Sequence, residues 1–147
     1  MFSRILIATD GSRLSRRAIA EGVALAKATG ATVVGFHALV PSPIIYYGDP
    51  MPLSPSTIEA FERDAEQVAS KCIGEIEKAA RKSGVPFKGV QVRATSPAET
   101  LIRVAKKERC DCIVMASHGR TGVKRVLLGS ETNFVLTHST IPVLVTR

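Results

Sequence analysis

The feature that most constrains the fold is an alternation of short apolar runs with longer amphipathic segments. The apolar runs have the length and composition of strands, and they cover residues 4–9, 31–40, 87–94, 110–116 and 141–146. Helical spacing of apolar residues marks the segments between them, at about residues 13–29, 56–83, 97–108 and 130–137. Strands that alternate with helices predict an α/β protein with an open, mainly parallel five-stranded sheet and helices on both faces, a Rossmann-like arrangement.

Short polar signals mark where several of these elements begin and end. Ser12 stands where the N-cap of the first helix is expected, and Gly30 stands where that helix stops. Residues 96–99 (SPAE) have the spacing of a capping box, so we expect Ser96 to cap the third helix with its side chain. Residues 87–94 are less apolar than the other strands, which predicts a place at an edge of the sheet.

The composition indicates how the chain is organised. Its 147 residues have the length of one ordinary domain, which we expect to cover residues 1–147. Hydrophobic residues make up 45% and charged residues 22%, as is typical of a globular protein, and no apolar stretch reaches the roughly 20 residues that cross a bilayer. The first residues read as a strand rather than a signal peptide. We therefore expect a soluble cytoplasmic protein without a membrane partner.

Charge and cysteine usage argue against nucleic-acid binding, a disulfide framework and a metal site. The formal net charge is +7, but the cations are spread along the predicted helices without interleaved aromatic residues, so nucleic acid is not an expected partner. Cys72, Cys110 and Cys112 are an odd number of cysteines without a secretory signal, which argues against a disulfide framework. Because no second Cys or His pair lies at ligand spacing from Cys110 and Cys112, we expect no metal site. We expect Cys72 and Cys112 to be buried like small hydrophobic residues.

The strongest functional signal is the stretch from residue 113 to residue 130. An apolar strand is followed by a loop that contains glycines and cations, and Gly129 then opens a helix. Glycines let backbone N–H groups approach an anion, and a helix N-terminus adds free N–H groups and the positive end of its dipole. Arg120, Lys124 and Arg125 add positive charge. The stretch predicts a phosphate-binding loop; the alternative is a glycine-containing crossover with a capped helix and no ligand.

A second unusual segment covers residues 41–55. It contains five prolines and both tyrosines of the chain, Tyr46 and Tyr47, so it is not expected to form regular structure. A loop of this length inside a compact domain predicts a lid or a contact surface. A variable, solvent-facing excursion is the alternative.

Four parts of the chain carry a pattern that is shared with a known family. The first strand ends in residues 9–12 (TDGS), the second ends near His37, and the last contains residues 142–145 (PVLV). Positions 116, 119, 129 and 130 follow the signature Gly, two residues, Gly, nine residues, and Gly followed by Ser or Thr, with Ala116 at the first glycine. The chain therefore resembles the nucleotide-binding branch of the universal stress protein family over essentially its whole length.

The resemblance implies a strand order of 3-2-1-4-5, which would place Asp10 and Ala116 side by side where the winding reverses. It also implies ATP as the ligand, accompanied by Mg²⁺ or Mn²⁺. Adenine would be surrounded by Ala8, Thr9, Asp10, Ala38 and Met115, and the ribose would lie near Ala116 and Ser117. The phosphates would be held by Gly119, Gly129, Ser130, Glu131 and Thr132, with Arg120 beside them. Because Ala116 replaces a glycine, its methyl group would come close to the sugar or a phosphate.

Several of these residues also have purely structural interpretations. Asp10 is placed to stabilise the start of the first helix. His37 is expected to bond a backbone group at its strand end rather than to do chemistry. Ser117 and His118 suggest a nucleophile and a base, but adjacent side chains on an extended chain point apart, which argues against catalysis.

Three functional hypotheses follow. The first is a regulatory, nucleotide-dependent module of the stress response with little or no turnover. The second is a slow ATPase or phosphoryl-transferring enzyme, although the sequence shows no clear general base or acidic metal pair beyond Asp10. The third is a nucleotide-free interaction protein, indicated by Ala116. The resemblance also implies a homodimer through the last strand, residues 141–146, which would cover an exposed sheet edge.

Overall fold

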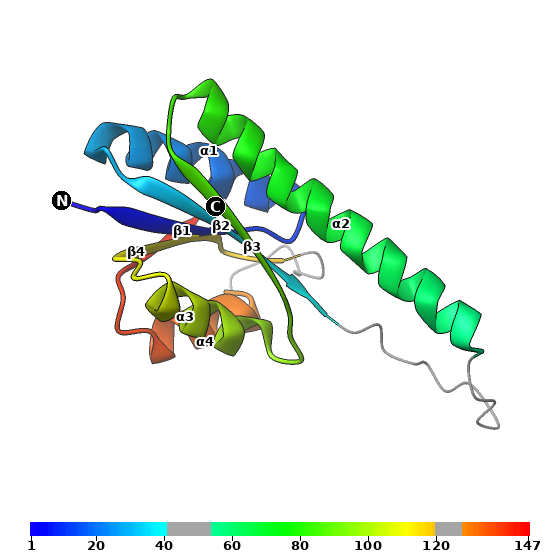
Figure 1. Ribbon diagram of the computed structural model, residues 1–147. Coiled ribbons are helices and arrows are strands. Elements are labelled where there is room, and N and C mark those ends of the chain that lie inside the picture. Colours follow the sequence, from blue (N-terminus) through cyan, green and yellow to red (C-terminus); the bar gives the residue numbers. More distant parts are fainter. Residues whose placement is uncertain (41–53, 120–127) are drawn as a thin grey trace.

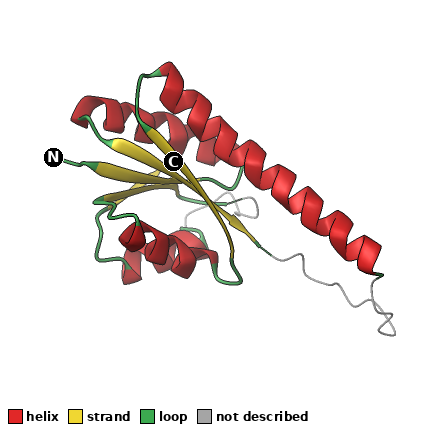
Figure 2. Cartoon of the chain, in the orientation of Figure 1, coloured by secondary structure: helices red, strands yellow, loops and turns green. Residues whose placement is uncertain are grey.

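The computed structural model describes residues 1–40, 54–119 and 128–147, and these form one parallel sheet with helices on both faces (Figures 1 and 2). In chain order the elements are β1 (Arg4–Ala8), α1 (Arg13–Thr29), β2 (Thr32–Leu39), α2 (Pro55–Lys82), β3 (Phe87–Arg93), α3 (Pro97–Lys107), β4 (Cys112–Ala116), α4 (Ser130–His138) and β5 (Val143–Thr146). The strand order is β3-β2-β1-β4-β5, and every pair is parallel. The predicted fold class, the strand order and the edge position of residues 87–93 are confirmed.

The core consists of two apolar layers that the sheet separates. Side chains of a strand alternate between the two faces of the sheet, so Ile5 and Ile7 pack with α1 and α2 while Leu6 packs on the opposite side. That opposite layer is closed by α3 and α4, as Figure 1 shows. Burial on both faces explains why the central strands are continuous apolar runs.

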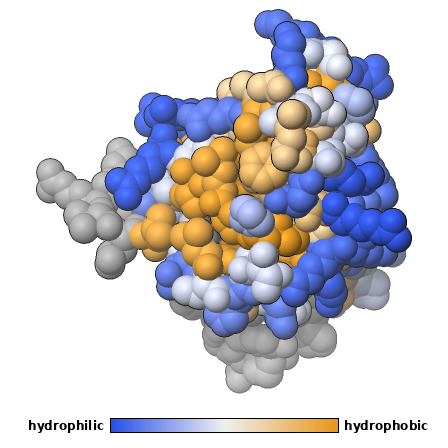
Figure 3. Space-filling view, turned by 90° about the vertical axis from the view of Figure 1, so that its left-hand side faces the viewer, coloured by the Kyte–Doolittle hydropathy of each residue, from blue (hydrophilic) through white to orange (hydrophobic). Residues whose placement is uncertain are grey.

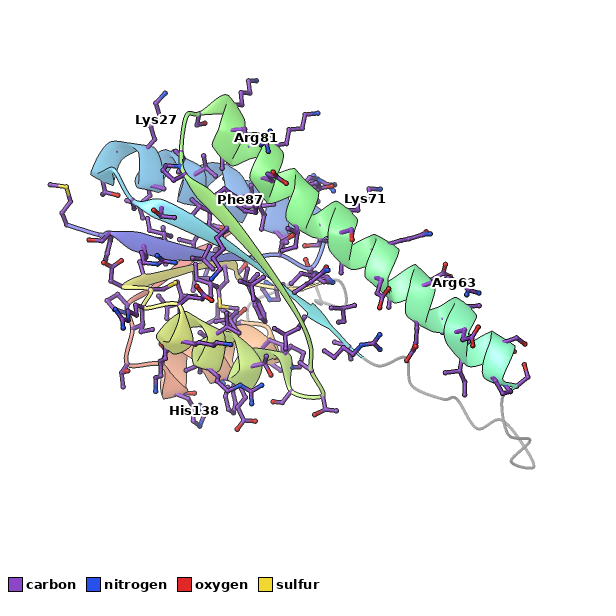
Figure 4. All side chains as sticks on the ribbon, viewed as in Figure 1. Lys27, Arg63, Lys71, Arg81, Phe87 and His138 are labelled. Atoms are coloured by element: carbon purple, nitrogen blue, oxygen red, sulfur yellow. The ribbon has the colours of Figure 1, made fainter. Side chains whose placement is uncertain are left out.

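The long helix α2 packs on the sheet with only one of its two halves. Its buried residues, Ala69, Cys72, Ile76 and Ala80, all lie in the carboxyl-terminal half. In Figure 4, Phe87 lies between this half and the sheet, whereas Arg63 and Lys71 extend from the outer side of the helix. The amino-terminal half reaches beyond the sheet (Figure 1), where Arg93 of β3 pairs with glutamates of α2. Packing in the second half therefore anchors the helix.

Helix ends follow the predicted signals at α1 but not at α3. The hydroxyl of Ser12 accepts the N–H of Ser15, and Gly30 closes α1 in the left-handed conformation, as predicted. The prediction that Ser96 caps α3 with its side chain is wrong, because that side chain makes no capping hydrogen bond. The backbone carbonyl of Ser96 still accepts the N–H of Thr100, so the helix begins there without side-chain capping.

Two predicted strands are shorter in the structure than in the sequence pattern. Residue 110 lies in the turn that closes α3, where the Cys110 N–H donates to the Ala105 carbonyl, so β4 begins only at Cys112. The last strand begins at Val143 rather than residue 141, because Pro142 has no N–H to donate to the sheet. The Pro142 carbonyl nevertheless accepts the N–H of Ile113, which holds the start of β5 against β4.

The three cysteines of the chain lie in the protein interior. Cys72, Cys110 and Cys112 are buried and unbridged, as expected for Cys72 and Cys112, and burial raises the pKa of the Cys110 thiol to about 11.

Glu108 accepts Lys88 Nζ at 2.7 Å and pairs with Arg4. The hydrogen bond from Lys88 is the largest influence that holds the pKa of Glu108 below its usual value. These contacts join the ends of β1, β3 and α3.

The surface carries apolar as well as charged side chains. Among the residues that the structure describes, the exposed large hydrophobic ones are Met1, Val40, Ile58, Phe61, Val68, Leu128, Leu136 and Leu144. On the face shown in Figure 3, hydrophobic residues gather into a patch that hydrophilic residues border. Contiguous apolar surface of this kind is typical of interaction sites. No helix in the described ranges 1–40, 54–119 and 128–147 has the length and apolar character needed to span a bilayer.

Two helices end in the same motif with different residues at its left-handed position. Gly84 follows α2 with φ 70°, and Arg109 follows α3 with φ 55°. Each donates its N–H to a carbonyl of the last turn, and the N–H of the next residue donates to the carbonyl one residue before that acceptor. Glycine adopts this conformation without strain, whereas an L-residue is strained there by about 1–2 kcal/mol.

We predict that Arg109→Gly raises the free energy of unfolding by about 0.5–1 kcal/mol, because relief of strain exceeds the added chain entropy of glycine. The matched variant Gly84→Ala is expected to lower it by about 1 kcal/mol, since it introduces the strain that Arg109 carries. Denaturant unfolding of the three proteins measures both changes. Equal destabilisation by both substitutions would contradict the strain at Arg109.

Candidate functional site

A cavity of about 670 Å³ opens at the carboxyl ends of β1, β2 and β4, beside the amino ends of α3 and α4. β1 lies between β2 and β4, so the chain winds away from β1 in opposite directions on its two sides. Ligands of open α/β sheets bind at such a reversal point. The cavity has the size of typical small-molecule sites.

One wall of the cavity is apolar and continues the protein core. Ala8, Ala38 and Met115 contribute this wall from three strands, and Phe36 and Leu101 extend it. All five pack in the layer between the sheet and the helices α3 and α4. The small alanine side chains leave space beside the strand ends, so this wall suits a flat apolar group such as an aromatic ring.

The opposite end of the cavity is formed by the start of α4. Gly129 is the N-cap residue and has no side chain to bond the first turn, so no side-chain cap is formed. The first helical bond runs from the Asn133 N–H to the Gly129 carbonyl. The N–H groups of residues 130–132 precede this bond and have no acceptor within the helix. Together with the helix dipole, they make this end of the cavity suited to an anion.

Gly119 and Gly129 allow the backbone to pass close to other atoms. A Cβ on Gly129 would lie 3.3 Å from the Ser117 carbonyl oxygen and 3.4 Å from the His118 Cα. A Cβ on Gly119 would lie 3.1 Å from Asp10 Oδ2. A side chain at either position would displace its neighbours by a few tenths of an ångström, backbone atoms in the case of Gly129 and the end of the Asp10 side chain in the case of Gly119.

Asp10 and His37 make the structural contacts that were expected and also line the cavity. Asp10 Oδ1 accepts the N–H of Ser12 at 2.9 Å, which stabilises the turn before α1. His37 Nδ1 donates to the carbonyl oxygen of Thr9 at 2.9 Å, because a carbonyl can only accept. The expectation of a backbone partner for His37 is confirmed. This bond leaves Nε2 without the proton in the neutral ring.

Ala116 tolerates its methyl group because the backbone there is regular. It is the last residue of β4, pairs with Thr146 of β5, and packs in the layer beneath α1. Its conformation does not need a glycine, because Arg109 is the one non-glycine residue with positive φ in the described part of the chain. The Ala116 carbonyl accepts the hydroxyl of Thr132 at 2.9 Å.

The expectation that Ser117 and His118 point apart is wrong. His118 Nδ1 lies 3.1 Å from Ser117 Oγ, because the chain turns after β4 and brings the two side chains together. Ser117 is only 3% exposed and lies outside the cavity lining, while His118 lines the cavity. A hydroxyl buried behind the wall is not positioned to attack a ligand, so this contact does not form a catalytic pair.

The structure brings most of the predicted site residues to this one cavity. Those that line it are Ala8, Thr9, Asp10, Ala38, Met115, Ala116, Gly119, Gly129, Ser130, Glu131 and Thr132. Ser117 lies behind the wall, and Arg120, Lys124, Arg125 and the predicted lid segment up to residue 53 lie outside the described residues.

Sequence reasoning missed part of the wall. The lining residues that it did not assign are Ser15, Phe36, His37, Val40, Pro97, Ala98, Leu101, His118 and Leu128. Phe36 and Val40 were detectable, because they share a strand face with Ala38. Pro97, Ala98 and Leu101 reach the cavity only because α3 packs under β2 and β4. Fold and site together define a doubly wound α/β protein with a ligand crevice at its reversal point.

Comparison with known proteins identifies the family. The model of the universal stress protein family matches residues 1–147. A universal stress protein of Thermus aquaticus is 36% identical over 147 residues, which cover all of both chains. The solved structure of hypothetical protein MJ0577 from Methanocaldococcus jannaschii has a TM-score of 0.85 and 27% identity, over 99% of this chain and 96% of that one.

A third comparison shows the same fold with a ligand. The universal stress protein of Archaeoglobus fulgidus in complex with dAMP has a TM-score of 0.66 and 18% identity, over 99% of this chain and 98% of that one. The chain belongs to the universal stress protein family, so the resemblance seen in the sequence is confirmed.

We predict that Thr132→Val lowers the free energy of unfolding by about 1–2 kcal/mol, because the buried Ala116 carbonyl loses its donor. The matched variant Thr137→Val removes a hydroxyl that bonds the Asn133 carbonyl on the exposed side of the same helix. That change is expected to alter stability by less than about 0.5 kcal/mol. Denaturant unfolding checks both values, and a neutral Thr132→Val would show that the buried bond is unimportant.

Proposed function

We propose that this universal stress protein binds an adenine nucleotide, with ATP as the ligand, and acts as a nucleotide-dependent regulatory module of the stress response in the cytoplasm. The whole of residues 1–147 would form the binding domain. The observation that carries the proposal is a single cavity that joins an apolar wall to a helix N-terminus without a side-chain cap. A nucleotide combines the same two chemistries, a flat base and a charged phosphate group.

The proposed arrangement of the nucleotide follows from the apolar wall and the helix N-terminus of the cavity. Adenine would lie against Ala8, Ala38 and Met115, near the backbone of Thr9 and Asp10, and the ribose would lie beside Ala116. The phosphates would accept N–H groups from the first turn of α4 and from the glycine-containing segment around Gly119, accompanied by Mg²⁺ or Mn²⁺. Arg120 would add charge. A solved structure of the same fold in complex with dAMP supports an adenine nucleotide as the class of ligand.

Binding without turnover is the favoured mode. Ser117 is buried in a contact with His118, and Asp10 already accepts a backbone N–H at the start of α1. Neither group is arranged as a nucleophile with an oriented base. A slow ATPase therefore ranks below a regulatory module.

We predict that calorimetry with ATP and Mg²⁺ detects binding to the unaltered protein and at least about tenfold weaker binding to Gly129→Ala. The added Cβ would press against two backbone atoms that have little freedom to move. Gly74→Ala is the matched control, because its Cβ would have no atom within 4 Å and should leave affinity unchanged. Absence of heat from the unaltered protein, and of bound nucleotide in native mass spectrometry, would instead favour a nucleotide-free interaction protein.

We further infer that the protein forms a homodimer through β5. In the described part of the chain, β5 pairs only with β4, so its outer edge has unpaired backbone groups. Leu144 is 40% exposed on this strand, and Leu136 is equally exposed on the neighbouring helix α4. Pairing with the β5 strand of a second copy would satisfy the backbone groups of this edge and cover the two leucines.

Leu144→Lys is expected to weaken the dimer by at least about tenfold, because a charge would be buried without a partner. Ile58→Lys provides the matched control, since Ile58 is a similarly exposed apolar residue on α2, away from β5. Sedimentation equilibrium measures the dissociation constants. Equal effects of the two variants, or a monomeric unaltered protein, would refute the β5 interface.

A further inference from the structure

Two helix N-termini meet at the cavity, and neither is capped by the side chain of its own N-cap residue. Ser96 makes no capping hydrogen bond to α3, and Gly129 has no side chain with which to cap α4. Both helices contribute first-turn residues to the cavity lining, Ala98 from α3 and Glu131 from α4. The cavity therefore contains two positions that favour a negative charge.

Glu131 already supplies the negative charge at one of these positions. Its Oε2 accepts the N–H of Ala98 at 2.7 Å, a contact between residues 33 positions apart. This distance is typical of a charge-assisted hydrogen bond. The carboxylate of α4 thus occupies the amino end of α3, while the first turn of α4 itself stays available to a ligand.

We propose that Glu131 determines specificity by discriminating among nucleotides according to the number of their phosphate charges. This inference rests on the nucleotide site proposed above. The carboxylate lies in the wall of the same cavity as the α4 amino end, so it is well within a Debye length of any phosphate bound there. Its repulsion grows with the charge of the phosphate chain, so it acts against a triphosphate more than against a monophosphate.

This role of the Glu131 side chain is separate from the one that the family resemblance implied, in which residue 131 helps to hold a phosphate and which its backbone N–H can still fill. A carboxylate has no donor for a phosphate oxygen. Its hydrogen bond to Ala98 also ties the first turn of α4 to α3, which positions the donors that the ligand would use. The negative charge of this side chain and its hydrogen bond to the Ala98 N–H can therefore be removed separately by mutation.

The test compares AMP and ATP binding by calorimetry, without divalent cations and at low ionic strength. Glu131→Gln removes the charge but keeps an oxygen that accepts the Ala98 N–H. It should tighten ATP binding by about fivefold and AMP binding by about twofold or less. Glu131→Ala should shift the AMP-to-ATP affinity ratio in the same direction and also weaken AMP binding, because the tie to α3 is lost. The matched control Glu99→Gln removes an exposed charge in the first turn of α3 outside the cavity lining, and should change the ratio less than Glu131→Gln does, because water surrounds that carboxylate.

Two results would overturn the inference while leaving the nucleotide site intact. An unchanged ratio in both Glu131 variants would show that its charge is not sensed by the ligand. Weaker ATP binding by Glu131→Gln would show that the carboxylate assists the phosphates. If the unaltered protein bound neither nucleotide, the proposed function itself would fail, and the inference with it.

Discussion

The position of β1 between β2 and β4 is the constraint on which the site depends. Ile5 pairs with Val33 on one side and with Cys112 on the other, and both pairings are parallel. Parallel neighbours bring three carboxyl ends to one edge, and the reversal of winding at β1 separates the segments that follow them. The crevice is therefore a consequence of strand order, and the side chains that line it only give it its chemistry.

The apolar part and the polar part of the cavity come from different structural elements. Residues that alternate toward α3 and α4 form the apolar wall, as an extension of the core. Backbone groups form the polar end, where Gly119 and Gly129 permit close approach and α4 begins without a side-chain cap. A ligand with a flat base and a phosphate matches this division, which gives the proposed nucleotide function its physical basis.

In the proposed function, electrostatics within the cavity would add a second level of selection. One helix N-terminus is satisfied internally by Glu131, and the other is left for an external anion. Under the proposed function such a difference would separate AMP, ADP and ATP, which share the same base and ribose and differ in the charge of their phosphates. Specificity is a difference between affinities, and a fixed repulsive charge is one way to create it.

The sequence by itself indicated the strands, the helices and a phosphate-binding loop, because apolar periodicity and glycine spacing are local properties of the chain. The family, and the assignment of individual residues to the site, came from the match of its motifs to a known family. The strand order and the ligand chemistry came through the family resemblance rather than from periodicity. Only the tertiary structure decided that Ala98 meets Glu131, that Leu101 joins the wall, and that Ser96 does not cap its helix. These contacts join residues that are distant in the chain or depend on how α3 packs against α4, so no local pattern records them.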